Sequence, residues 1–237
     1  MVSNERLASV FVEMADTLVD EFDLIDFLHN LADHAVSVSG AASAGLLLAD
    51  QNDSLHFMAA SSEAARHLEL FQVQHSEGPC FDCYRSQESV ITTNLAQETQ
   101  RWPEFAPRAK EAGVRSVHAF PMRLRDRMIG ALNVFGVEPL PLGPEDIKVV
   151  QAMADVATIA ILQERAIASA ELLTEQLQEA LNSRIVVEQA KGVVSRDHDV
   201  SVDDAFAALR SHARSNHLRL ADLAADVVTG TVSLPRS

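Results

Sequence analysis

Two cysteines in the first half of the chain, Cys80 and Cys83, have the spacing of a redox pair or of two zinc ligands. His75 precedes Cys80 by five residues and could serve as a third ligand. A structural zinc site has four ligands, so a fourth, such as His118, would have to come from another element. A Gly-Pro pair directly before Cys80 breaks regular structure. We therefore expect a loop over a pocket that the cysteines line, with redox or metal sensing as the alternative.

Cationic side chains recur at helical spacing near the C-terminal end of the sequence. A polar stripe with spacings of four, three and four residues consists of Arg184, Glu188, Lys191 and Ser195. In the following segment, Arg210 and Arg214 are one helical turn apart. Such cations could contact the phosphates or base edges of a nucleic acid. A helical bundle with ordinary surface charges would give the same pattern.

Two further residues of this first segment could take part in binding. Gly192 stands in the middle of a helical pattern, where glycine costs roughly 1 kcal/mol relative to alanine, so we expect close approach of another helix or of a ligand backbone. Gln189 could pair with a base or could be structural. The side chains expected to face the helical core are Ile185, Val186, Ala190, Val193 and Val194.

Composition and missing motifs limit the classes of function. The chain has no dinucleotide-binding glycine motif, Walker loop, Gly-x-Ser-x-Gly or His-Glu-x-x-His, so we expect a protein that is not an enzyme. Of the formal net charge of −15, residues 1–164 carry −13 (11 Lys+Arg, 24 Asp+Glu) and residues 165–237 carry −2 (8 and 10). The front part should therefore repel nucleic acid and anionic membranes. No apolar run could span a bilayer, no secretory signal is recognisable, and two cysteines fit a reducing compartment, so we expect a soluble cytoplasmic protein without a membrane partner.

The elements of the front part follow an α+β pattern. Helices are predicted at 7–22, from Leu24 to Ala35, at Ser62–Gln74 and at Trp102–Ala112. Strands are predicted at Ala44–Ala49, Ser54–Ala60, Ser89–Thr93, Val114–Met122 and Met128–Val137. This order of helices, hairpin, helix and strands indicates an antiparallel sheet flanked by helices rather than a parallel sheet.

A breaker at Pro139–Pro144 precedes a long helical stretch. An apolar seam with spacings of four and three residues covers Ala166, Ala170, Leu173, Leu177, Ala180 and Arg184. The seam could pack on its own domain, but its solvated neighbours favour a parallel homodimer. Beyond it, the segment Ile185–Gly230 predicts three short helical units, the second of which starts at Ser201 with Asp204 at a capping position.

The C-terminal pattern resembles the ANTAR domain. The resemblance is carried by the run from Ala180 to Val194, with the core Glu-Gln-Ala-Lys-Gly, and by the continuation from Ser201 to Arg214. It implies a three-helix module after a coiled coil that binds RNA hairpins and prevents transcription termination. It also implies paired stem-loops as the RNA partner, contacted by Arg184, Gln189, Lys191, Gly192, Arg210 and Arg214.

The front part resembles a GAF domain in its element order and in two segments, His75-Ser-Glu-Gly-Pro-Cys80 and Met128-Ile-Gly-Ala-Leu-Asn-Val134. GAF modules bind a small molecule between the sheet and its covering loops. The resemblance thus implies an unidentified small-molecule ligand that is not covalently held. Candidate pocket residues are Phe57, Cys80, Phe81, Cys83, Phe120 and Asn133. The combination of the two domains resembles actinobacterial GAF–ANTAR regulators.

We therefore expect a GAF-like sensor domain at residues 1–143, a coiled-coil linker helix at 144–183 and an ANTAR output domain at 184–237. Ligand binding would change the packing of the linker helix and so the presentation of two output modules to RNA.

Two other functions stay open. DNA binding would use Ser201–Arg214 and Leu220–Thr229 as a helix-turn-helix, although Asp222 and Asp226 suit a recognition helix poorly. A dimeric interaction protein that touches no nucleic acid is the third possibility, and the net acidity favours it.

Overall fold

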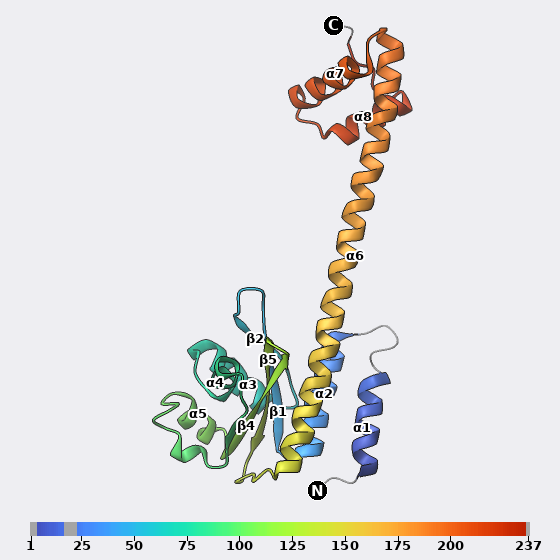
Figure 1. The fold of residues 1–237 in the computed structure, drawn as a ribbon. Coiled ribbons are helices and arrows are strands. Elements are labelled where there is room, and N and C mark those ends of the chain that lie inside the picture. Colours follow the sequence, from blue (N-terminus) through green and yellow to red (C-terminus); the bar gives the residue numbers. More distant parts are fainter. Residues whose placement is uncertain (1–3, 17–22, 236–237) are drawn as a thin grey trace. The chain divides into compact units, whose positions relative to one another are not determined.

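The computed structural model describes residues 4–16 and 23–235 of the chain. The chain divides into two compact units, Met1–Glu164 and Arg165–Ser237, and each has a hydrophobic core of its own (Figure 1). One helix, α6 (Pro144–His198), contributes its first part to the first unit and the rest to the second.

The first unit is built on a five-stranded antiparallel sheet with the strand order β2-β1-β5-β4-β3 (Figure 1). The strands are β1 (Ser43–Ala49), β2 (Leu55–Ala60), β3 (Val90–Thr92), β4 (Ser116–Leu124) and β5 (Arg127–Gly136). The hairpins β1–β2 and β4–β5 are joined by pairing of β1 with β5. This arrangement confirms the predicted α+β fold.

Helices cover both faces of the sheet (Figure 1). One face carries α1 (Asn4–Asp16), α2 (Leu24–Ser39) and the first part of α6, and the other carries α3 (Glu63–His75), α4 (Pro79–Ser86) and α5 (Phe105–Glu111). A short 3-10 helix, η1 (Leu95–Gln97), follows β3. Neighbouring strand residues point to opposite faces, so Leu46 and Leu48 enter the first core and Leu47 enters the second. Full burial of one leucine stabilises the fold by roughly 1.5–3 kcal/mol.

Capping residues and a Gly-Pro pair determine where α3, α4 and α5 begin. The Ser62 hydroxyl accepts a hydrogen bond from Ala65 N (3.2 Å) and so caps the start of α3. Gly78 has a φ of 131°, a conformation that favours glycine, and Pro79 follows at the first position of α4. The Glu77 carboxylate accepts two backbone N–H hydrogen bonds of 2.8 Å at the start of α5. The sequence 76–79 therefore ends one helix and positions the next two.

The structure differs from the sequence prediction most clearly at α4, where we expected a loop. Eight residues are too few to show a helical period, and we took the Gly-Pro pair as a break, although proline at a first helical position starts a helix. The helix predicted at 7–22 is confirmed as far as Asp16, and residues 17–22 lie outside the described residues. The helix predicted at Trp102–Ala112 begins later, at Phe105.

The second unit has a small core that three helical segments form. The last part of α6 packs with α7 (Val202–Ser215) and α8 (Leu220–Thr229). The buried side chains are Ala190, Val194, Ala205, Leu209, Ala213, Leu223, Ala224, Val227 and Leu234. The predicted cap of α7 is confirmed, because the Ser201 hydroxyl accepts a hydrogen bond from Asp204 N (3.1 Å) and donates one to the Asp204 carboxylate (2.6 Å).

The predicted first short helix of this unit is the C-terminal part of the continuous helix α6. Of its expected core residues, Ala190 and Val194 are buried and Val186 and Val193 are half-buried. Ile185 was wrongly expected to face the core, since its side chain is 55% exposed. It lies about 140° around the helix from Ala190, five residues away, and so points to solvent.

Candidate functional site

The cations predicted to contact RNA lie on α6 and α7. Arg184, Arg210 and Arg214 are exposed, and none of the three forms an ion pair with another residue in the described part of the chain. Lys191 differs, since its side chain is only 15% exposed. The three arginines are therefore available to an anionic partner.

Lys191 of α6 contacts side chains on both α6 and α7. Its Nζ lies 3.0 Å from both carboxylate oxygens of Glu188, one turn earlier on α6. The same Nζ lies 5.5 Å from the ring centroid of Phe206 on α7, within the range of a cation–π contact. In the free chain the ammonium group of Lys191 thus has partners on both helices.

The predicted RNA-contacting residues of α6 do not all share one side of the helix. Arg184 and Lys191 are seven residues apart and lie on the same side, whereas Gln189 precedes Lys191 by two residues and points nearly the opposite way. Gly192 is exposed, and a Cβ built there would meet no atom within 4 Å. The close approach of another helix that we expected at Gly192 is therefore not found among the described residues, and its side of α6 is open.

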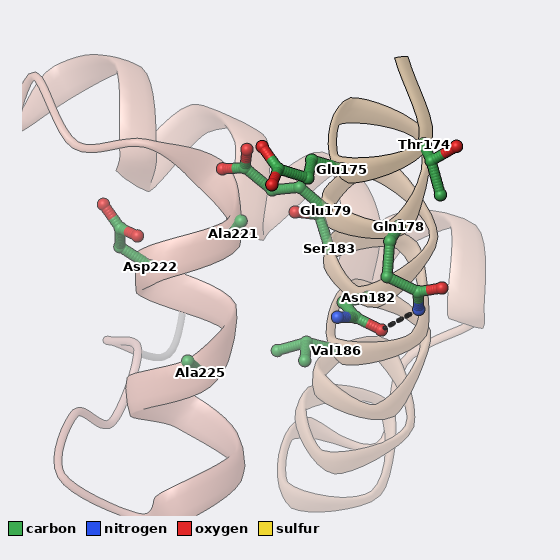
Figure 2. A pocket seen from close by; sticks show the side chains of 10 residues that line it. All are labelled: Thr174, Glu175, Gln178, Glu179, Asn182, Ser183, Val186, Ala221, Asp222 and Ala225. Atoms are coloured by element: carbon green, nitrogen blue, oxygen red, sulfur yellow. Dashed lines mark hydrogen bonds between the residues drawn. The ribbon is translucent and has the colours of Figure 1, made fainter. Parts of the chain in front are cut away.

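A groove of about 610 Å³ lies between α6 and α8 (Figure 2). It is lined by Thr174, Glu175, Gln178, Glu179, Asn182, Ser183, Val186, Ala221, Asp222 and Ala225. Three of these residues are acidic, and in Figure 2 Glu175 and Glu179 project from α6 toward the part of α8 that carries Ala221. Arg219 does not offset this acidity, because its Nε and Nη2 donate hydrogen bonds of 2.8 and 3.0 Å to the Asp222 carboxylate. The acidic residues of the groove therefore disfavour contact with a nucleic-acid backbone.

The apolar seam of α6 faces away from this groove. Leu177 precedes Glu179 by two residues, which places the two side chains on nearly opposite sides of the helix, while Leu177 and Arg184 are seven residues apart and share a side. Leu173 and Leu177 are 56% and 57% exposed, and Leu181 is similarly exposed. The seam is thus apolar, exposed, and continuous with the side of α6 that carries Arg184 and Lys191.

The predicted ligand-pocket residues of the first unit fall on two faces of the sheet. Cys80 and Cys83 are buried, and Phe57 and Phe81 partly buried, in the core layer that α3, α4 and α5 cover. Asn133 faces the same side, since neighbouring residues of β5 alternate and Ala131 and Phe135 belong to this layer. Phe120 is in the core on the opposite face, with α2 and α6. The prediction that groups Phe120 with the others is therefore wrong, because the face on which a β4 residue lies depends on pairing with distant strands and could not be read from the local sequence.

Three buried polar side chains form a cluster in this layer, named the Glu69 cluster and consisting of Glu69, Gln72 and Asn133. Asn133 Nδ2 donates a hydrogen bond of 2.7 Å to Glu69 Oε1, and Gln72 Nε2 donates one of 2.9 Å to Glu69 Oε2. Gln72 Oε1 accepts a hydrogen bond of 2.9 Å from Cys80 N at the start of α4. The cluster connects α3, β5 and α4.

Sequence reasoning missed Glu69 and Gln72, although a signal was present. The apolar residues Ala65, Leu68 and Phe71 mark one face of α3, and Glu69 and Gln72 stand four residues after Ala65 and Leu68. Residues four apart share a helix face, so both polar residues had to point toward the sheet. Burial raises the pKa of Glu69 to about 8, against the two amide hydrogen bonds, which lower it.

The cysteines do not have the surroundings of a redox or metal site. Burial raises the pKa of Cys83 to about 12 and that of Cys80 well above its ordinary value, so both thiols stay protonated. His75 is exposed and bonded through Nδ1 to Phe71 O (3.0 Å), and His118 lies on the other side of β4 from the cysteines, 2.7 Å from Leu140 O. Within the described residues no group of three or more His, Cys, Asp or Glu is placed to hold a metal ion.

One chain thus carries an α+β domain and a helical module with exposed cations. Comparison with protein families shows that this is a regulatory protein with a sensor domain: residues 23–162 match the GAF domain and residues 175–228 match the ANTAR domain. The chain belongs to the GAF domain family, and it also carries an ANTAR domain. GAF is a ligand-sensing family and ANTAR an RNA-binding antitermination family, and both are regulatory rather than catalytic.

Solved structures share the fold of the first unit. The GAF domain of a phosphoenolpyruvate-protein phosphotransferase from Acinetobacter is 16% identical, with a TM-score of 0.54, over 71% of this chain and 99% of that chain. The corresponding domain from Coxiella burnetii is 15% identical, with a TM-score of 0.55, over 70% and 99%. A free methionine-R-sulfoxide reductase from Neisseria meningitidis, in complex with its substrate, is 16% identical with a TM-score of 0.54, over 70% and 96%. At these identities the likeness extends to the fold alone.

No curated protein sequence matches the chain. In the described part of the chain, none of the helices has an apolar stretch long enough to cross a membrane.

Proposed function

We propose that this protein is a cytoplasmic, ligand-responsive regulator of the actinobacterial GAF–ANTAR type that binds RNA hairpins and prevents transcription termination. The observation that carries the proposal is the surface of the ANTAR domain. Arg184, Arg210 and Arg214 are exposed and unpaired among the described residues of a chain whose net charge is −15. In such an acidic chain, a local group of free cations is what a polyanionic partner would select.

The proposed RNA site consists of the three arginines, with Lys191 and Gly192 beside them on α6. Gln189 points to another side of α6, so it would contact a different part of the RNA. Lys191 would keep its contact with Phe206 and orient the α6–α7 side, while the arginines contact phosphates. Loss of one arginine would then remove one charge-assisted contact without unfolding the module.

The proposed active form is a parallel homodimer through the seam of α6. Its support is the exposure of the seam residues Leu173 and Leu177, and of Leu181 beside the seam, because each large apolar side chain left in water forgoes roughly 1.5–3 kcal/mol of burial. Arg184 is the last position of the seam, where two like charges would end the pairing. A dimer of this kind presents two output modules to two stem-loops, and linked binding raises affinity without any new contact.

The proposed domain limits are 1–143 for the sensor, 144–183 for the linker and 184–237 for the output. The boundary at residue 184 falls inside α6, so no flexible hinge separates the linker from the output domain in sequence. We infer that ligand binding in the sensor changes the packing of α6 residues such as Val150, Met153 and Ala157, which are buried in the core beneath the sheet, and thereby shifts the dimer population.

DNA binding through α7 and α8 has less support. A recognition helix needs free cations or amides, and Arg219 at the start of α8 is engaged by Asp222.

The test is a fluorescence anisotropy titration of the full chain against three labelled probes: an RNA with two stem-loops, an RNA with one, and a DNA duplex of the same sequence. We expect the double stem-loop RNA to bind at least roughly 100-fold more tightly than the single loop, as linked binding predicts. Equal affinity for the DNA duplex would contradict the proposal.

A further inference from the structure

The Glu69 cluster has more hydrogen-bond acceptors than donors. Both Glu69 oxygens accept one amide hydrogen bond, Gln72 Oε1 accepts one bond from Cys80 N, and Asn133 Oδ1 has no partner among the described residues although it is fully buried. A buried acceptor left without a donor costs about 1–3 kcal/mol. With Glu69 ionised, the cluster therefore has more acceptors than N–H or O–H donors in the closed chain.

The cluster also lacks a cation. Glu69 forms no ion pair with any residue that the structure describes. Of the elements packed around it, β1 has no titratable side chain and β5 has only Arg127 at its exposed start. α4 places the Cys80 thiol near it, while Asp82 of α4 is bonded to Arg101 and Arg85 lies over the Phe81 ring. The charged groups of β2 and α5 are exposed: His56, Arg108, Lys110 and Glu111. Among residues 4–16 and 23–235, no cationic group thus neutralises a Glu69 carboxylate.

The backbone around the cluster makes room for it. Gly45 of β1 pairs with Asn133 of β5, and a Cβ at Gly45 would lie 2.6 Å from Glu69 Oε1. A Cβ at Gly78, before α4, would lie 2.4 Å from Gln72 Oε1. The Glu69 and Gln72 side chains therefore occupy space that only glycine leaves open.

We propose that the Glu69 cluster is the ligand-recognition point of the sensor and that the ligand is a small molecule with a primary ammonium group. An ammonium nitrogen carries one positive charge and three N–H donors. It would donate to the Glu69 carboxylate, to Asn133 Oδ1 and to the second lone pair of Gln72 Oε1. This inference rests on the proposed function, in that it names the class of ligand to which the sensor responds.

Other head groups fit the cluster less well. An anion would face Glu69 without a donor, and an alcohol supplies one donor and no charge. A guanidinium group is larger and planar, and it needs paired acceptors in one plane. The cluster is enclosed in this structure, so entry of the ammonium group requires outward movement of α4. This eight-residue helix begins after Gly78 and ends at Ser86, and the next residue, Gln87, has a φ of 59°.

Binding would be linked to a proton. Because the pKa of Glu69 is raised to about 8, the carboxyl group is mostly protonated at pH 7, and pairing with a cation requires its ionised form. The carboxyl proton is released to solvent as the ammonium group binds. The affinity should therefore rise about tenfold per pH unit below pH 8 and level off above it.

The experiment measures thermal unfolding of the full chain with propylammonium, 1-propanol or propionate at matched ionic strength. We expect Tm to rise by roughly 3–6 °C when propylammonium is present at about ten times its Kd, and no comparable rise with the other two probes. Glu69→Gln should abolish the rise. This variant keeps the shape of the side chain, and rotation of the Asn133 amide lets Oδ1 accept from the new amide. Glu111→Gln on the exposed end of α5 makes the same charge change away from the cluster and should leave the rise intact.

Equal shifts with all three probes, or a full propylammonium shift in the Glu69→Gln chain, would overturn the proposal. If that variant does not fold, the pH dependence of the propylammonium Kd in the unchanged chain decides, since a Kd that is constant from pH 6 to 8 contradicts a role for Glu69. RNA binding is not part of this readout. A chain that binds propylammonium but not RNA would refute the proposed function and leave this inference standing as a binding property of the first unit.

Discussion

The two units of this protein hold their polar side chains in different ways. The first unit buries Glu69, Gln72 and Asn133 in a contact network within an apolar layer, whereas the second leaves Arg184 and the α7 arginines in solvent. A polyanion such as RNA can be held only by cations that reach the surface. The electrostatic attraction of such cations extends over about 10 Å of solvent before salt screens it. A small ligand is best distinguished inside a low-dielectric core, where each unmatched donor or acceptor is costly. Burial and exposure therefore correspond to two kinds of partner.

The glycines show the same contrast. In the first unit, a Cβ at Gly45 would collide with Glu69, while in the second a Cβ at Gly192 would meet open space. The first glycine is required by packing inside the protein, and the second is not.

A substitution in the seam of α6 tests whether the exposed leucines of the second unit form an interface, and we expect it to have the strongest effect on RNA binding. Leu177→Asp places two carboxylates in the proposed seam, so we expect a dimer to become monomeric and the affinity for a double stem-loop RNA to fall by roughly 10²- to 10⁴-fold through loss of linked binding. Analytical ultracentrifugation and anisotropy titration measure the two quantities.

The matched control for this change is Leu172→Asp. Leu172 and Leu177 are each 57% exposed, but Leu172 lies outside the seam, about 130–140° around α6 from Leu177. If the Leu172→Asp chain dissociates as readily as the Leu177→Asp chain, the seam is not the dimer interface.

The second effect concerns the buried carboxyl group. The pKa of Glu69 in the folded chain is about 8, above its ordinary value of 4.5, so between these pH values the unfolded chain ionises while the folded chain stays protonated. Stability is therefore fully present below pH 4.5 and is lost as the pH rises, at about 1.4 kcal/mol per pH unit, until it levels off near pH 8. We expect Glu69→Gln to lack this slope. Urea unfolding of both chains at several pH values gives the difference, and parallel curves would show that Glu69 is ionised in the folded state.

Alanine substitutions at Gly45 and Gly192 should change the free energy of unfolding only modestly and with opposite signs. Gly45→Ala should destabilise the first unit by roughly 1–3 kcal/mol, because the enclosed Glu69 carboxyl group cannot move aside. Gly192→Ala should stabilise α6 by up to about 1 kcal/mol, since alanine is the better helix former and nothing obstructs its methyl group. Differential unfolding of each variant checks both signs. If the RNA backbone packs against Gly192, the Gly192→Ala chain should bind RNA more weakly. An unchanged RNA affinity would show that Gly192 is not part of the RNA site.

The fold could be predicted from sequence further than the site could. The periodic spacing of apolar residues and the turn residues predicted the strands, most of the helices and the cap at Ser201, because these features depend on neighbours within a few residues. The face on which a strand residue lies depends on pairing between distant strands, and so Phe120 was assigned to the wrong side of the sheet. α4 was missed because eight residues show no clear period.

The buried Glu69 cluster could not have been assembled from sequence alone. The spacing of Glu69 and Gln72 after Ala65 and Leu68 indicated burial, but their partner Asn133 is 64 residues away and meets Glu69 only through the β1–β5 pairing. By contrast, the exposed state of Arg210 and Arg214 follows from their place on α7, where each is the residue directly after a member of the apolar face that holds Leu209 and Ala213 and so lies beside that face.

A salt-dependent titration can decide whether RNA is held by the α6–α7 side, as we propose, or by the acidic α6–α8 side. The full chain, an Arg210→Ala/Arg214→Ala chain and an Arg219→Ala chain are titrated with the double stem-loop RNA at several salt concentrations. We predict that the double variant loses roughly 10- to 100-fold in affinity and that the slope of log K against log salt falls by about 1.4–1.8, while Arg219→Ala stays near the unchanged chain. Unchanged affinity and slope in the double variant, or an equal loss in Arg219→Ala, would contradict the claim.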